Sequence, residues 1–381
     1  MPKSATVLLL CLAGCGTALL CAAALSFERV EIDAAPPQNP WIKVAGDLDG
    51  DGKADVVIGG SKGPLVWYRN PSWTKSVIAA GGYDSVDAEA ADIDGDGDLD
   101  LVVGGLLWYE NPRPAGDPGK SPWRAHRIAS HHTHDVEVAD LDRDGKLDIV
   151  VRGQSGFGAN EGHRIFVFRQ NARDSWASRE IECPPGEGLK LADVDADGDA
   201  DIVVAGRWFE NTGAALAGGW HERIYTSAWT YEDSAVATGD LNGDGRLDIL
   251  LTPAEYKGGS YRVAWYEAPA NPMSGSWAEH VVAAPVETVI HAAAIADMDG
   301  DKAPDLVTAA MHQGAAPQEV TVFLNRGSGL RWEKSVVSTR GSHNILLVDL
   351  DGDGRIDILG ANHAGPYSPV EWWRNTSRLT R

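Results

Sequence analysis

The sequence predicts an all-β protein, a single seven-bladed β-propeller, and three observations support this prediction. A nine-residue acidic loop occurs seven times along the 381-residue chain. Its copies begin 45, 48, 53, 47, 57 and 52 residues apart, which is the period of propeller blades. Each copy is followed by short segments with strand-like composition, and a strand missing from the last repeat is present near the N-terminus.

The acidic loops have oxygen-bearing side chains at positions 1, 3, 5 and 9. In chain order the loops are Asp47–Asp55, Asp92–Asp100, Asp140–Asp148, Asp193–Asp201, Asp240–Asp248, Asp297–Asp305 and Asp349–Asp357. Glycines at positions 4 and 6 permit the tight turn that brings these oxygens together. Converging carboxylates repel one another unless a hard cation lies between them, and Ca²⁺ accepts six to eight oxygen ligands. We therefore expect several structural calcium ions.

The expected calcium ligands are the side chains at those four positions. They are Asp47, Asp49, Asp51 and Asp55; Asp92, Asp94, Asp96 and Asp100; Asp140, Asp142, Asp144 and Asp148; Asp193, Asp195, Asp197 and Asp201; Asp240, Asn242, Asp244 and Asp248; Asp297, Asp299, Asp301 and Asp305; and Asp349, Asp351, Asp353 and Asp357. Asn242 replaces an aspartate but still offers an oxygen. Lys302 replaces the position-6 glycine, a poorer residue for positive φ, so the sequence leaves calcium binding by the sixth loop open.

An EF-hand is the alternative explanation of these loops, and two features exclude it. An EF-hand loop needs a bidentate glutamate at position 12, whereas the first three loops have Ile58, Val103 and Val151 there. The residues that follow each loop are also typical of β-strands and lack helical spacing.

Each repeat continues with a buried strand, an aromatic strand and a tryptophan-led outer strand. Most aromatic strands contain a tryptophan, at Trp67, Trp108, Trp208, Trp265 and Trp372, and the outer strands begin at Trp73, Trp123, Trp176, Trp220, Trp277 and Trp332. The seventh outer strand is missing from the C-terminal end, but Phe27–Ile32 has the same pattern. We expect this segment to complete the seventh blade and close the ring, because closure removes exposed strand edges. One propeller then spans residues 26–376, followed by a short tail, 377–381.

The first 25 residues are predicted to be an export segment. Lys3 precedes an apolar stretch from Ala5 to Leu25, as in a signal peptide. Leu12–Cys15 matches a lipoprotein cleavage box, while cleavage near residues 22–24 and retention as a membrane anchor stay open as alternatives. The expected location is periplasmic, cell-surface or secreted, with membrane contact only through this segment. Cys183 is the one cysteine outside it, so no internal disulfide is expected.

The net charge of −22 argues against a nucleic-acid partner, because phosphate binding requires a basic face. The acidity is concentrated in the loops, which contain 29 of the 55 acidic residues. It therefore indicates metal binding rather than a cationic partner, and a monomer is expected.

Histidines recur at one position on the face opposite the calcium loops. The residues six before each loop are Trp41, Val86, His134, Glu187, Ser234, His291 and His343. The second strands should return Arg152, Gln154, Arg207, His312 and His363 to the same face. We expect a pocket at the mouth of the central channel lined by His134, His291, His312, His343, His363 and Arg152. The structural alternative is a polar channel whose side chains merely bond to backbone and water.

The repeats resemble the FG-GAP and VCBS-type β-propellers over nearly the whole mature chain. That resemblance implies that each calcium loop joins the two inner strands of its blade. The stretches around His291, His312, His343 and His363 also resemble propeller polysaccharide lyases that act on rhamnose–glucuronate linkages. They resemble, more weakly, the propeller of sugar dehydratases that act on aldosuloses.

Two functions follow as hypotheses. The first is β-elimination on a uronic-acid polysaccharide, with Arg152 neutralising the substrate carboxylate, His343 or His291 taking the C5 proton, and His363 or His312 donating a proton. The second is a non-catalytic propeller that binds carbohydrate or protein. Imidazoles around the axis are also suited to an additional metal such as Zn²⁺, and the fold alone does not separate these functions.

Overall fold

The structure is a computed structural model that describes residues 25–60, 63–81, 87–104, 106–154, 162–213, 216, 218–287, 289–365 and 368–378. Most of the predicted export segment, residues 1–24, lies outside this range. The described residues contain 28 β-strands and no helix, and accordingly none of their segments is a helix that could span a membrane.

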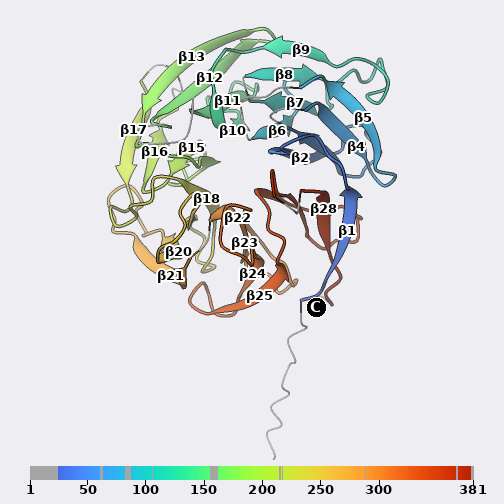
Figure 1. Ribbon diagram of the computed structural model, residues 1–381. Helices are drawn as coiled ribbons and strands as arrows, with labels where there is room; N and C mark the ends of the chain where they lie inside the picture. The colour runs from blue at the N-terminus through green and yellow to red at the C-terminus, as the bar shows by residue number, and fades with distance from the viewer. Residues whose placement is uncertain are drawn as a thin grey trace, which may run out of the picture.

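The strands form seven four-stranded antiparallel sheets arranged in a ring around a central axis (Figure 1). The innermost strands, one from each blade, are β2 (Ile42–Gly46), β6 (Ala88–Ala91), β10 (Thr133–Ala139), β14 (Lys190–Ala192), β18 (Ser234–Gly239), β22 (Ile290–Ala296) and β26 (Asn344–Val348). The second strands are β3 (Asp55–Gly59), β7 (Asp100–Val103), β11 (Asp148–Gly153), β15 (Asp201–Val204), β19 (Asp248–Pro253), β23 (Asp305–Ala310) and β27 (Asp357–Ala361).

The third strands are the aromatic ones and the fourth strands form the rim. The third strands are β4 (Leu65–Arg69), β8 (Leu107–Glu110), β12 (Arg164–Ala172), β16 (Arg207–Asn211), β20 (Tyr261–Glu267), β24 (Val320–Asn325) and β28 (Val370–Asn375). The outer strands are β5 (Thr74–Ala79), β9 (Arg124–Arg127), β13 (Ser175–Glu182), β17 (Trp220–Ile224), β21 (Ala278–Val286), β25 (Trp332–Ser338) and β1 (Phe27–Asp33).

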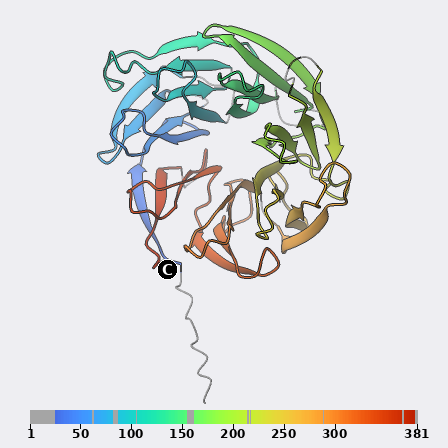
Figure 2. The ribbon, with the colours of Figure 1, turned by 180° about the vertical axis from the view of Figure 1, so that it is seen from behind.

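Ring closure by the N-terminal strand is confirmed. β1 pairs antiparallel with β28, with Phe27 opposite Asn375 and Val30 opposite Trp372. Viewed from either side, the first strand lies beside the last one (Figures 1 and 2). The backbone N–H of Thr376 also donates to the carbonyl of Ser26 at 2.8 Å. Blade 7 therefore contains both ends of the propeller, and its outer edge is paired like that of every other blade.

The hydrophobic core is divided into seven clusters, one between each pair of neighbouring blades. In the cluster between blades 1 and 2, Trp67 of β4 packs with Leu101 and Tyr109 of the next blade. The tryptophans of the third strands are almost completely buried. A single blade cannot bury both of its faces, so each blade depends on its neighbours.

Asparagines after the aromatic pairs connect neighbouring blades. Asn111 Nδ2 donates to the carbonyl of Leu48 in the preceding blade at 2.9 Å and to that of Leu99 in its own loop at 3.0 Å. The same pair of bonds is made by Asn70, Asn211, Asn325 and Asn375. These buried hydrogen bonds hold five of the seven acidic loops against the blade that follows.

Candidate functional site

The acidic loops join the first and second strands of every blade, as expected. The position-1 carboxylate organises the turn: Asp47 Oδ1 accepts the backbone N–H groups of Gly50 and Asp51, and its Oδ2 accepts that of Gly52. Carboxylate oxygens of Asp47, Asp49 and Asp55 lie within 4.8 Å of one another. The residues present therefore fit a calcium ion, because several hard oxygens are gathered in a loop whose turn is already formed.

The position-9 aspartates also have a structural role that the sequence did not reveal. Asp55 is fully buried, and its two oxygens accept the backbone N–H groups of Leu48 and Asn70. Equivalent bonds recur in all seven loops. Position 9 thus ties the loop to the third strand in addition to facing the proposed ion.

The sixth loop keeps the shape of the others in spite of its lysine. Lys302 adopts φ of 73°, in the region that normally favours glycine, and its N–H donates to Asp297 Oδ2 at 2.9 Å. Its turn is therefore formed like those of the other loops.

Arginines lie against the position-3 carboxylates of five loops. Examples are Arg69 with Asp49 at 2.5 Å and Arg326 with Asp299 at 2.6 Å. The other three pairs are Arg173 with Asp94, Arg169 with Asp142, and Arg374 with Asp351. These ion pairs offset part of the repulsion within the acidic loops.

Five histidines form one continuous run of ring contacts around the channel axis. Along the run, the ring centroids are 6.0 Å apart for His134 and His291, 4.1 Å for His291 and His343, 4.7 Å for His343 and His363, and 4.3 Å for His363 and His312. The structure therefore brings these five side chains together, as the sequence predicts, although they come from blades 3, 6 and 7. Val86, which the same pattern placed on this face, lies outside the described residues.

The five rings differ in exposure. His134, His291 and His343 are only 6%, 6% and 3% exposed, while His312 and His363 are half-buried. The inner three lie at or just before the start of β10, β22 and β26, and the outer two lie on the connections that follow β23 and β27.

The inner three histidines are held by different partners. His291 Nδ1 lies 3.0 Å from the carbonyl oxygen of His343, to which it donates its hydrogen. Burial lowers the pKa of His291, and burial together with the neighbouring rings and Lys43 holds that of His343 well below its usual value. Burial opposes protonation of His134 too, but the charges of Glu187 and Asp135 outweigh it and raise its pKa well above the usual value.

The outer two histidines are neutral bases. Burial and the adjacent His312 lower the pKa of His363 to about 3. Burial and the charge of Lys257 lower the pKa of His312. Asn362 fixes their relative position, since its Oδ1 accepts the backbone N–H of His312 at 3.0 Å and its Nδ2 donates to Arg340 O at 2.7 Å.

Arg152 differs from its expected role. It is 1% exposed, and its guanidinium donates to the carbonyl oxygens of Gly162, Gly188 and Pro184 at 2.7–2.8 Å. The segments around residues 162 and 184–188 cover the side chain, so it braces them instead of presenting a charge at the channel mouth. Arg207 begins the third strand of blade 4, not the end of the second, and pairs with Glu222 at 2.8 Å.

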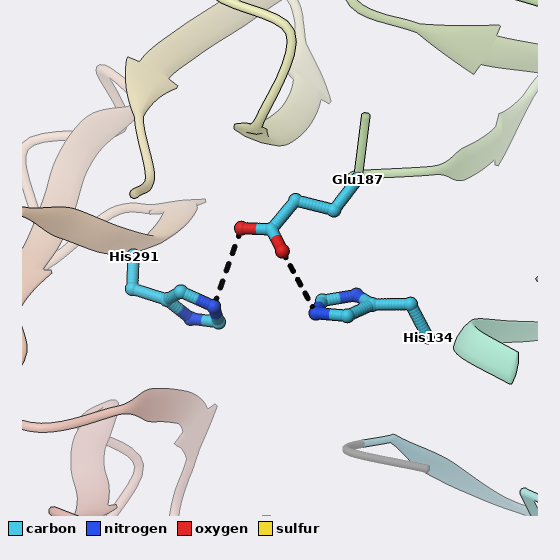
Figure 3. Close-up of side chains that lie close together, drawn as sticks. All are labelled: His134, Glu187 and His291. Atoms are coloured by element: carbon cyan, nitrogen blue, oxygen red, sulfur yellow. Dashed lines mark ion pairs between the residues drawn. The ribbon is translucent and has the colours of Figure 1, made fainter. Parts of the chain in front are cut away.

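Three acidic residues belong to the site although the histidine pattern did not include them. Glu187 lies between His134 and His291, with oxygens 3.0 Å and 3.4 Å from their Nε2 atoms (Figure 3). Asp135 approaches His134 Nδ1 at 3.4 Å, and Glu255 approaches His291 Nε2 at 3.6 Å. Glu187 shares the position six before its loop with the histidines, so its placement was visible in the sequence. Asp135 has a counterpart in Asp87, five residues before the loop of blade 2, whereas no glutamate recurs at the position of Glu255.

Beneath the histidines the channel holds a cavity of about 340 Å³ lined by residues of all seven inner strands or the segments just before them. Charged groups line it, including the buried Lys43 and the partly exposed Glu89 and Lys190. Burial raises the pKa of Glu89 to about 8 and lowers that of Lys43 to about 7. The channel therefore combines charged groups with apolar side chains such as Val44 and Leu346.

Comparison with known proteins supports the repeat assignment. The family described as the FG-GAP-like repeat matches residues 47–103, 193–251 and 297–360. No curated protein matches the chain.

Solved structures that are similar to the chain have low sequence identity to it. BBS1N, solved in complex with ARL6DN, is 13% identical with a TM-score of 0.59, over 93% of this chain and 98% of that one. Rhamnogalacturonan lyase YesW is 12% identical with a TM-score of 0.48, over 93% and 73% of the two chains. The Bacillus licheniformis rhamnogalacturonan lyase PL11 is 14% identical with a TM-score of 0.49, over 93% and 76%. At these identities a likeness shows the fold alone. The chain is a seven-bladed β-propeller, and three stretches of it match the FG-GAP-like repeat.

Proposed function

We propose that the protein is an exported, calcium-stabilised propeller that acts on a uronic-acid polysaccharide by β-elimination at the histidine-lined channel mouth. The observation that carries this proposal is the pair His312 and His363. Both rings are half-buried at the opening of the site, and their centroids are 4.3 Å apart. The pair is therefore placed where a polymer can reach it without entering the channel.

The Nδ1 atoms of this pair have no hydrogen-bond partner among the described residues. By contrast, His126 on the outer strand β9 is bonded through both nitrogens, to Asp174 and Glu110. A ring whose tautomer is not fixed by the protein can accept a proton on one nitrogen and release one from the other. Because the Nδ1 atoms are buried, we assign removal of the C5 proton of a uronate and protonation of the leaving oxygen to the Nε2 atoms of the pair.

Two further side chains fit a sugar at this position. Trp41 is half-buried, and its ring lies 5.7 Å from that of His363; an indole offers an apolar face with a polar edge. Lys257 is exposed on the loop after β19, close enough for its charge to affect His312. We assign to Lys257 the attraction of the substrate carboxylate that was first expected of Arg152.

Calcium is proposed as a structural component of the fold. When bound, it would neutralise the loop carboxylates and link the two inner strands of each blade. The apolar segment at residues 5–25 supports export to the periplasm, cell surface or medium. The partner is then an extracellular polysaccharide, and rhamnose–glucuronate polymers are the first substrates to try.

Comparing His363→Ala with wild type tests the proposal. Ultraviolet absorbance of unsaturated product, followed on rhamnose–glucuronate polysaccharide, should fall about 10²–10⁴-fold in the variant, as for loss of a positioned acid or base. His221→Ala is the matched control, because that ring is 59% exposed on the outer strand β17. Equal turnover by His363→Ala and wild type would overturn the proposal. Sugar binding without turnover by wild type would favour the non-catalytic alternative.

A further inference from the structure

The arrangement around Glu187 brings its carboxylate and a ring nitrogen each of His134 and His291 to one point. His134 precedes the acidic loop of blade 3, Glu187 that of blade 4, and His291 that of blade 6. Glu187 Oε2 lies 3.0 Å from His134 Nε2, and its Oε1 lies 3.4 Å from His291 Nε2 (Figure 3). The carboxylate is 1% exposed. Its Oε2 faces Nε2 of His134, and its Oε1 accepts no hydrogen bond of regular geometry from the described residues.

The tautomer of His291 defines what faces this carboxylate. A carbonyl oxygen can only accept, so the contact of His291 Nδ1 with His343 O at 3.0 Å places the hydrogen on Nδ1. In the neutral ring Nε2 then carries a lone pair, and it points toward an anionic oxygen. An acceptor facing an acceptor in a buried site is unfavourable unless a cation lies between them.

The surroundings match those of a metal-ligating histidine pair. Such histidines usually direct their second nitrogen to a carbonyl or carboxylate, which orients the ring. His291 uses the carbonyl of His343, and His134 has Asp135 Oδ2 at 3.4 Å from Nδ1. The same Asp135 oxygen accepts the backbone N–H of Gly188 at 3.0 Å, which also fixes the segment that carries Glu187.

The distances fit a small tetrahedral ion. Zinc bonds of about 2.0–2.2 Å place tetrahedral ligands about 3.3 Å apart, close to the two separations at Glu187. All three ligand atoms lie within 4.8 Å of one another. Glu255 Oε1, 3.6 Å from His291 Nε2 with its side chain 20% exposed, borders the remaining side of the site.

We propose that His134, Glu187 and His291 form a binding site for one transition-metal dication of the Zn²⁺ class, distinct from the seven oxygen-only loops. Two imidazoles and one carboxylate are the ligand set of several catalytic zinc centres and leave a fourth position open. Imidazole nitrogen also favours zinc and similar metals over calcium. A metal here would bind the uronate carboxylate from below the His312–His363 pair. That last role rests on the proposed function, whereas metal binding itself does not.

A cobalt titration of the full mature chain tests the site. The protein is stripped of transition metals, kept in excess Ca²⁺ to occupy the loops, and titrated with Co²⁺ while the visible spectrum is recorded. We expect one equivalent to bind with the intense absorption of a tetrahedral nitrogen and oxygen site, and one equivalent of Zn²⁺ to displace it. A wild-type chain that binds no Co²⁺ under these conditions overturns the proposal, whatever the variants do.

Variants then locate the site. Glu187→Gln keeps the side-chain shape and should weaken Co²⁺ binding by at least about 10–100-fold, the loss seen even for indirect partners of a metal. His291→Gln serves as the second variant if the first does not fold, as judged by its melting curve. His221→Ala should bind like wild type. Unchanged affinity in a folded Glu187→Gln or His291→Gln would refute the assignment. Metal binding without polysaccharide cleavage would uphold the site while rejecting the proposed function.

Discussion

Replacing Asn111 by alanine tests how the blades are joined. The side chain is 1% exposed, and its amide donates to the carbonyls of Leu48 and Leu99 at 2.9 and 3.0 Å. Alanine leaves both buried carbonyls without this donor, and an unsatisfied buried group costs about 1–3 kcal/mol. We expect the free energy of unfolding to fall by about 2–4 kcal/mol.

The backbone contributes little to this cost. Blade 5 has Ala268 at the equivalent position, and its N–H donates to Asp248 as that of Asn111 donates to Asp100. The backbone conformation at this position therefore accepts alanine. The expected loss of stability comes from removing the side-chain amide of Asn111.

Urea unfolding followed by tryptophan fluorescence, with Ca²⁺ in excess, measures the effect. Asn171→Ala is the control, because Asn171 is exposed near the end of β12, and it should stay within about 0.5 kcal/mol of wild type. An Asn111→Ala variant equally close to wild type would refute the idea that these asparagines join the blades.

Three further results are expected. Removal of calcium should lower the melting temperature reversibly, since each bound ion stabilises the fold by about 2.7 kcal/mol when calcium is at 100 times its Kd. The arginines at five loops should keep the metal-free chain folded. An identical melting curve in chelator, with no residual metal, would contradict a structural role for calcium. Deletion of residues 25–33 should expose the edge of β28 and cause aggregation, so a soluble monomeric deletion product would count against ring closure. The pKa of His363 is about 3 in the fold against the ordinary value of 6.5, so only the unfolded chain takes up its proton between those values and stability falls as pH drops from 6.5 toward 3. Because His363 is only half-buried, solvent screening limits this contribution to about 2 kcal/mol. His363→Gln should remove this part of the pH dependence measured by urea unfolding, and an unaltered profile would contradict it.

The fold could be predicted because its determinants repeat. The acidic loops mark the first turn of every blade, and the tryptophans mark the third strand. Even closure was predictable, since Phe27–Ile32 repeats the outer-strand pattern. The interblade role of the asparagines was not recognised, although Asn70 and its counterparts recur at one position. The carbonyls that accept their hydrogen bonds lie 63–280 residues away in the chain. The repeats therefore showed where the asparagines recur but not which carbonyls they bond.

The site was predictable where it follows the repeat and not elsewhere. His134, His291 and His343 share one register, and the structure brings them together. Arg152 was also placed correctly on the second strand, but the connections that cover it belong to blade 3 and the start of blade 4 alone. Glu255 likewise lies on an irregular loop. No periodic pattern describes such loops, so their contacts appear only in the folded chain.

Mass spectrometry of the products tests the central claim, that the channel mouth catalyses elimination, most directly. The calcium-loaded mature chain is incubated with a defined rhamnose–glucuronate oligosaccharide, and the fragments are weighed. Elimination divides the substrate without adding water, so the fragment masses should sum to that of the parent, with unsaturation on the uronate. Fragments heavier in sum by one water, or an intact oligosaccharide after prolonged incubation, would contradict the account.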